Sequence, residues 1–204
     1  AGTLAPANCV HDFGDGLSIL PGGPGTDATG RRHTHVLSAG ERRSLFRRVS
    51  QLYRDYDVVI VDAGSRLDTV ITAGAAGARR FIAVGGDGTV AIAASYALVK
   101  AIELKSPGTP VDLIVNRQDD RRGRHVFDQV QEASARFLGR ALDFAGTIPE
   151  DGDLYAAALS GQSLRLIADR TIAGQTAGVL ARRLLVQLED GADFAFRHRY
   201  LGAR

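Results

Sequence analysis

The residues YDVVIVDAG, at positions 56–64, decide which class of fold this chain can adopt. The β-branched run at positions 58–61 is too short and too continuously apolar for an amphipathic helix, so it predicts a strand buried on both faces. Strands of that kind form parallel sheets that helices cover on each side. Asp62 ends the predicted strand, where such sheets bind ligands. Two roles for Asp62 remain open: binding magnesium near phosphates, or starting a turn that Gly64 completes.

The composition is that of a globular protein with a substantial core. The chain has 204 residues, of which 45% are hydrophobic and 24% charged. No apolar run approaches the roughly 18 residues of a membrane span, and the first residues lack the pattern of a secretory signal. We therefore expect a cytoplasmic protein, with peripheral membrane association as an alternative. The expected organisation is a domain over residues 1–190 followed by a C-terminal tail over residues 191–204.

Predicted strands alternate with predicted helices along the chain. A capping box of Ser38 and Glu41 marks the start of one amphipathic helix. Alternation of this kind predicts an α/β fold, a mostly parallel sheet with helices on both faces. Besides residues 58–61, the predicted strands cover residues 17–20, 80–84, 111–115 and 142–147. The predicted helices cover residues 39–54, 68–77, 90–104, 124–138, 153–159 and 172–188.

Two glycine-rich segments come close to the phosphate-binding motif G-x-x-x-x-G-K-[ST]. Residues 25–32 read GTDATGRR, with arginines where lysine and a hydroxyl are required. Residues 21–27 read PGGPGTD, which holds no lysine and has an Asp in place of the hydroxyl. We interpret both segments as ordinary turns.

Polar residues follow three of the predicted strands. Asn116 and Arg117 come after VDLIV, where an amide can pair with a purine edge and a guanidinium can stack on it. The alternative is an Asn that only ends a strand. The loop TIPEDG, residues 147–152, lies at the same edge, and its alternative role is a proline turn that caps the next helix. The loop GGDG, residues 85–88, carries no cation and is predicted to be a turn.

Taken in order, these segments resemble the MinD/ParA family of deviant-Walker P-loop ATPases, and most closely the FlhG/FleN flagellar-number regulator type. The resemblance covers residues 16–165, and its order and spacing carry it more than any single motif. The matching pieces are residues 16–23, 56–64, 89–102, 111–117, 126–139 and 142–151.

The resemblance implies a role for each candidate site residue. Asp62 matches the aspartate that holds Mg²⁺ through water, and Gly64 matches the start of the second switch. Asn116 and Arg117 match the pair beside the adenine of ATP or ADP. The loop expected to close over that base consists of Pro149, Glu150 and Asp151.

The family's phosphate loop, KGGVGK[ST], has no counterpart in these residues. Its place falls before Ala1, so we expect a P-loop NTPase-like sheet that lacks the first strand, the phosphate loop and the first helix. The intact protein is expected to hydrolyse ATP, and this chain alone to be inactive. An incomplete sheet also predicts an exposed apolar strand edge.

Two functions stay open. The first is an ATP-dependent switch that forms a homodimer when ATP is bound and acts in spatial positioning or number control, of the flagellar or septum and partition type. It would act on a protein partner or a membrane surface. The second is a non-catalytic interaction module, because Ser65, Arg66 and Ser95 depart from the family's usual residues. Its basic surface, such as the arginine-rich face of the helix at 39–54, would bind nucleic acid or membrane.

Overall fold

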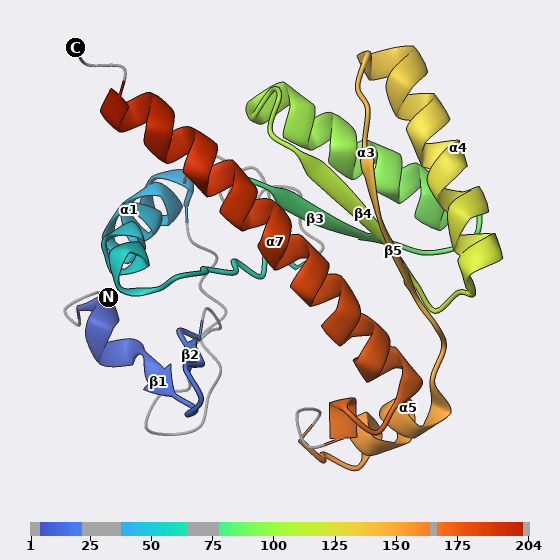
Figure 1. Ribbon diagram of the computed structural model, residues 1–204, viewed down its shortest axis with the longest axis horizontal. Coiled ribbons are helices and arrows are strands. Elements are labelled where there is room, and N and C mark those ends of the chain that lie inside the picture. Colours follow the sequence, from blue (N-terminus) through green and yellow to red (C-terminus); the bar gives the residue numbers. More distant parts are fainter. Residues whose placement is uncertain (1–4, 22–37, 65–77, 164–166, 202–204) are drawn as a thin grey trace. The chain divides into compact units, whose positions relative to one another are not determined.

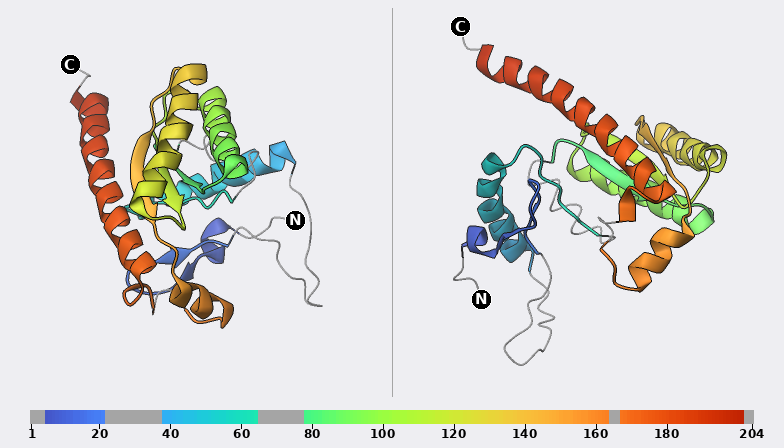
Figure 2. Two further views of the ribbon diagram at one scale, coloured as in Figure 1. Left: turned by 90° about the vertical axis from the view of Figure 1, so that its right-hand side faces the viewer. Right: turned by 60° about the horizontal axis from the view of Figure 1, so that its bottom comes forward.

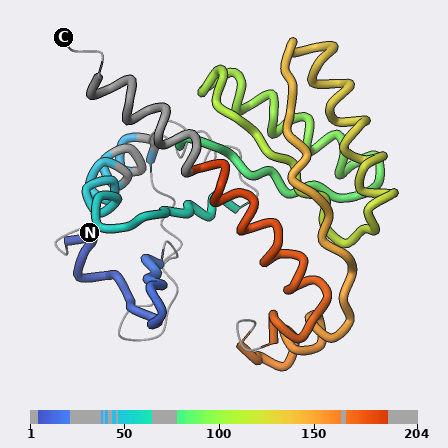
Figure 3. Tube along the Cα trace, viewed as in Figure 1, coloured from blue at the N-terminus to red at the C-terminus, as the bar shows by residue number. Residues whose placement is uncertain are grey.

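The computed structural model describes residues 5–21, 38–64, 78–163 and 167–201 (Figure 1), and Figure 3 traces the path of the chain in the same view. The chain divides into two compact units, Ala1–Ala78 and Arg79–Arg204, which are treated separately below. The predicted helix at residues 68–77 and most of the two glycine-rich loops lie outside the described residues.

The first unit contains short elements. A 3₁₀ turn, η1 (Pro6–Cys9), precedes β1 (His11–Asp12), which pairs antiparallel with β2 (Ser18–Ile19). The sequence predicted a strand near β2 but no partner for it. A tight turn joins the two strands, and in it the Asp12 carboxylate accepts a hydrogen bond from the backbone N–H of Gly14 at 2.8 Å.

The arginine-rich helix of the first unit is divided into two segments, α1 (Ala39–Val49) and the 3₁₀ segment η2 (Ser50–Asp55). Its predicted capping box is confirmed. The backbone N–H of Ser38 donates to the Glu41 carboxylate at 2.8 Å, and the backbone N–H of Glu41 donates to the Ser38 hydroxyl at 3.2 Å.

The prediction of a buried strand at residues 58–61 is wrong for this structure. These residues have no regular secondary structure and all are exposed, with Ile60 at 85%. A strand needs a neighbour to pair with its backbone and packed layers to cover its side chains, and no described strand pairs with this segment. The β-branched residues at 58–61 favour an extended backbone, but they do not by themselves provide a neighbouring strand.

The second unit is built on a parallel three-stranded sheet. Its order is β3 (Phe81–Gly85), β4 (Val111–Asn116) and β5 (Asp143–Ile148). Two helices, α3 (Thr89–Lys105) and α4 (Asp120–Leu138), cover one face of the sheet, while α7 (Ile172–Leu201) crosses the other face against β5 (Figures 1 and 2). The short helix α5 (Gly152–Leu159) connects β5 towards α7. The predicted α/β class is confirmed.

The central strand β4 forms the core of this unit. All its residues from Val111 to Val115 are buried, because it has a strand on either side and helices on both faces. Val111, Leu113 and Val115 lie on the side of α3 and α4, whose own buried residues meet them. Those residues are Val99 and Ile102 of α3 and Val126 and Val130 of α4.

An extra residue interrupts the pairing of β5 with β4. Leu113 pairs with Phe144, but Ile114 pairs with Gly146, so Ala145 has no partner on β4. The bulge changes which side chains face each layer. After it, Thr147 contacts α4 at Gly123, and Gly146 lies against Leu180 of α7.

The outer strand β3 leaves apolar side chains uncovered. Among the described residues it pairs with β4 alone. Ala83 faces α3 and is buried, whereas Ile82 and Val84, on the other face, are 49% and 62% exposed. This agrees with the predicted apolar edge.

The last helix is longer than its sequence pattern predicted. It continues to Leu201 instead of ending at residue 188, and no proline interrupts that stretch. In the part of the chain that the structure describes, no helix is both long and apolar enough to cross a bilayer.

Candidate functional site

Three loops meet at the carboxyl edge of the sheet in the second unit. Because β3, β4 and β5 are parallel, the loops that follow them emerge on the same side. Each loop was singled out from the sequence, as residues 85–88, 116–117 and 149–151. The structure shows which of their side chains interact.

Asn116 and Arg117 form a tight turn at the end of β4. The Asn116 side-chain oxygen accepts a hydrogen bond from the backbone N–H of Arg117 at 3.0 Å. Arg117 has a φ of 60°, in the left-handed region that non-glycine residues rarely adopt. Strain of this kind gathers at functional sites and holds a side chain in a set direction.

Arg117 reaches the loop that follows β5. Its Nη2 lies 2.5 Å from Oε1 of Glu150, and the two side chains are 70% and 67% exposed. The hydrogen bond that Arg117 donates to the Glu150 carboxylate raises the pKa of the Arg117 guanidinium above its usual value. The backbone N–H of Gln118 also donates to the carbonyl of Ile148 at 3.2 Å, so side chain and backbone together join the two loops.

Asp151 caps two helices, of which the sequence indicated only the one that follows it. Its carboxylate accepts hydrogen bonds from the backbone N–H of Leu154, in α5, and of Ala173, in α7, each at 3.0 Å. These bonds, that of Leu154 first, lower the pKa of the Asp151 carboxyl. One half-buried side chain therefore caps two helices, while Pro149, also half-buried, leads into the loop.

Two further pairs at this edge were missed from the sequence. Arg122, in the first turn of α4, donates from Nε and Nη2 to the Asp87 carboxylate at 2.8 and 3.1 Å. This contact lowers the pKa of the Asp87 carboxyl, so the loop predicted to lack a cation receives one from α4. The hydroxyl of Thr147 donates to the Asp120 carboxylate. The paired arginines at 121 and 122, next to the N-cap residue Asp119, were the available signal.

Asp62 and Gly64 belong to the first unit. One oxygen of the exposed Asp62 carboxylate accepts a hydrogen bond from the backbone N–H of Gly64 at 2.9 Å, and Gly64 has a φ of 59°. This is the turn considered for Asp62 from the sequence. The other carboxylate oxygen has no hydrogen-bond partner among the described residues. A carboxylate oxygen is a ligand that suits Mg²⁺, which takes one or two carboxylates and completes its shell with water and phosphate.

The carboxyl edge offers two guanidinium groups, an amide and several carboxylates, which can bind a ligand through charge, hydrogen bonds and stacking. Within the ranges that the structure describes, no group of three or more His, Cys, Asp or Glu side chains is placed to hold a metal.

Fold and edge together define the class: an α/β protein whose parallel sheet and helical layers are consistent with a P-loop NTPase-like fold. A comparison with known proteins finds 26% identity over 137 residues to the antiactivator FleN of Pseudomonas aeruginosa. The similarity supports a distant MinD/ParA-like relationship. No family model matches the chain.

The similarity to FleN has a limited extent. It spans 67% of this chain but 47% of FleN, so the chain corresponds to about half of that protein.

Proposed function

We propose that this chain is the C-terminal portion of a MinD/ParA-like ATPase that acts as an ATP-dependent dimerising switch in flagellar or similar number control. In this proposal Asn116 and Arg117 bind the adenine, and the loop of Pro149, Glu150 and Asp151 closes over it. Asp62 holds Mg²⁺ through water, and Gly64 begins a segment that responds to the terminal phosphate. The phosphates are held by a KGGxGK[ST] segment, which these 204 residues do not contain.

One observation carries the adenine-binding part of the proposal. Arg117 and Glu150, which lie far apart in the sequence, form an ion pair at the carboxyl edge of the sheet. Ligands of open α/β sheets bind outside this edge. Both partners are exposed, so the Arg117 guanidinium has a free face on which a purine can stack.

A second candidate, a non-catalytic interaction module, is favoured by Ser95. The resemblance implies an Asp at this position. Here the Ser95 hydroxyl is buried and donates to the carbonyl of Ala91 in its own helix at 2.9 Å. Ser95 therefore offers no free polar group to the nucleotide edge. A buried serine of this kind is compatible with a protein that keeps the fold but does not bind nucleotide.

Nucleotide binding by the intact protein tests the adenine-binding residues. We expect Arg117→Gly and Asn116→Ala each to weaken binding of a fluorescent ATP analogue about tenfold, the loss of one stacking or hydrogen-bonding contact. Glycine is the suitable change at 117, because the positive φ there costs it nothing. The matched control is Arg182→Ala, an exposed arginine on α7. Equal affinities in all four proteins would refute the assignment.

Hydrolysis tests Asp62 separately. Asp62→Ala in the intact protein should abolish magnesium-dependent ATP turnover while adenine binding persists. Turnover at the rate of the unmodified protein would exclude the metal role. Nucleotide binding that is absent even in the unmodified protein would favour the interaction module.

A further inference from the structure

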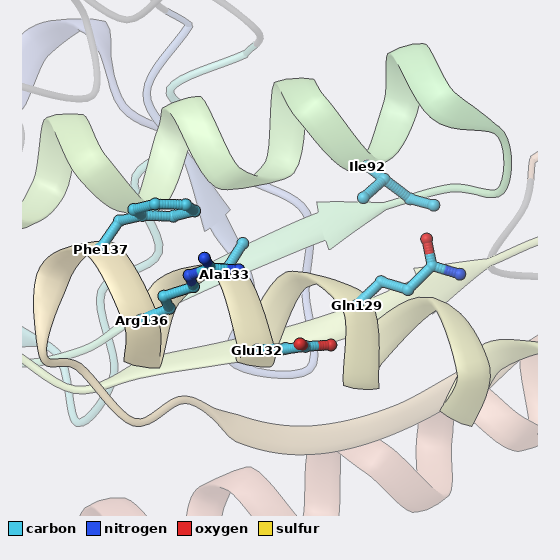
Figure 4. A pocket seen from close by; sticks show the side chains of 6 residues that line it. All are labelled: Ile92, Gln129, Glu132, Ala133, Arg136 and Phe137. Carbon is cyan, nitrogen blue, oxygen red and sulfur yellow. The ribbon is translucent and has the colours of Figure 1, made fainter.

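A hollow of about 280 Å³ lies on the outer surface between α3 and α4, away from the sheet (Figure 4). Figure 4 shows Phe137 and Ile92 at its two ends, with Ala133 between them. The remaining lining is polar and comes from α4. The full lining is Ile92, Gln129, Glu132, Ala133, Arg136 and Phe137.

The two charges beside the hollow have no ion-pair partner in the part of the chain that the structure describes. Glu132 and Arg136 are one helical turn apart, a spacing at which opposite charges commonly pair. Neither forms a salt bridge with any described residue. The Arg136 guanidinium lies over the Phe137 ring instead, 5.3 Å from its centre. Both signs of charge therefore remain available beside an apolar surface.

This arrangement is self-complementary. If two α4 helices meet antiparallel and cross at the level of residue 134, where Ala133 lies on the exposed face, a two-fold axis brings residue 132 of each copy opposite residue 136 of the other. The small side chain of Ala133 lets the helices approach closely. Phe137, which is 65% exposed, would then be covered by the other copy.

We propose that a second copy of this chain docks on this hollow, with α4 against α4 and Glu132 of each copy paired to Arg136 of the other. A contact built on one helix pair is smaller than the roughly 1,200 Å² of a stable interface, so the association is weak and concentration-dependent. The hollow includes none of the residues proposed to bind nucleotide, so the contact is expected to form without it. Phe137, at one end of the hollow, lies about 25 Å along α4 from Asp120, whereas Gln129 and Ile92 line the end nearer the carboxyl edge.

Charge reversal tests the contact on the 204-residue chain by sedimentation equilibrium over a range of concentrations, without nucleotide. Glu132→Arg places arginine opposite arginine, and Arg136→Glu places glutamate opposite glutamate. Each variant should associate about tenfold more weakly than the unmodified chain, because two attractive pairs become repulsive. In an equimolar mixture of the two variants both pairs are again opposite in charge, so association should return.

Arg182→Glu on α7 is the matched control, since it reverses an exposed arginine on another helix. It should leave association unchanged, and circular dichroism should show the same helix content in all variants. The proposal fails if the unmodified chain stays monomeric, if the single reversals associate as it does, or if the mixture is no stronger than its components. None of these results depends on whether the intact protein binds ATP.

Discussion

Asp151 links the starts of two helices through a single carboxylate. The first backbone N–H groups of a helix lack partners within it, and a capping oxygen satisfies one of them. Here the two oxygens cap α5 and α7. The loop that the resemblance assigns to adenine is therefore anchored on its C-terminal side, while its exposed Glu150 remains accessible.

We expect Asp151→Ala to lower the melting temperature of the chain more than Asp151→Asn, because asparagine keeps one accepting oxygen. The lowered pKa of Asp151 sets the pH dependence. A carboxyl with a lowered folded-state pKa stabilises the fold above its unfolded pKa, about 4, and loses that contribution as the pH falls through the folded value. The difference between Asp151→Ala and the unmodified chain should thus shrink in thermal unfolding below about pH 4.

Asp153→Ala is the control for Asp151. Asp153 lies in the same first turn of α5 and is exposed. Its removal should change the melting temperature little. An equal loss from both variants would mean that negative charge near the helix start, and not the double cap, is responsible.

Gly123 allows α4 to approach β5. A Cβ at this position would lie 1.8 Å from Cγ2 of Thr147, which no small adjustment accommodates. Gly123→Ala should destabilise the chain by about 2–4 kcal/mol. In contrast, a Cβ at Gly178 in α7 would have its nearest contact at 3.7 Å, so Gly178→Ala should stabilise by about 0.5–1 kcal/mol. Urea unfolding measures both values, and equal effects would contradict the packing argument.

At the residue scale, the sequence placed the candidate residues at strand ends but did not predict their contacts. The positions of Asn116, Arg117 and residues 149–151 followed from strand ends, because parallel strands place their carboxyl ends together. The pairing of Asp87 with Arg122 was not foreseen. The two residues are far apart in the sequence, and their contact depends on how α4 packs against the sheet. No local sequence pattern specifies that packing.

At the scale of elements, periodicity predicted the second unit well. The bounds of the three strands of its sheet were each predicted within one or two residues. A short apolar run between two predicted helices is too short for a buried helix, so it is most readily explained as a buried strand. The start of α4 was placed four residues late, at 124 instead of Asp120, since the polar residues of its first turn resemble a loop. The strand at 58–61 failed for a different reason: its pairing depends on a neighbour that local sequence does not specify.

The exposed edge of β3 should make the chain prone to association through its sheet. Replacing Val84 by lysine puts a charge on the apolar face of this outer strand, which is how natural sheets protect open edges. We expect Val84→Lys to reduce light scattering during heating. Val90→Lys is the control. Val90 is 84% exposed on α3, so this substitution adds the same charge away from the edge of the sheet. An equal reduction by both variants would assign the effect to net charge.

At the scale of the whole molecule, the second unit carries two separate surfaces. The carboxyl edge holds most of the residues proposed for nucleotide binding, and the hollow between α3 and α4 carries the proposed contact between copies. A switch with both could combine a nucleotide-dependent dimer with weak association that persists without nucleotide. The two would respond to different variants, at Arg117 and at Glu132.

The bulge at Ala145 also bears on how this chain can change in length. Since the extra residue sets the phase of the last part of β5, deleting it would turn Thr147 away from α4 and bring Gly146 towards that helix. An insertion or deletion before Gly146 would therefore swap the side chains that face α4 with those that face α7. The exposed turn after α5, around Gly161, has no such coupling. Related proteins should thus differ in length there while keeping the number of residues in β5.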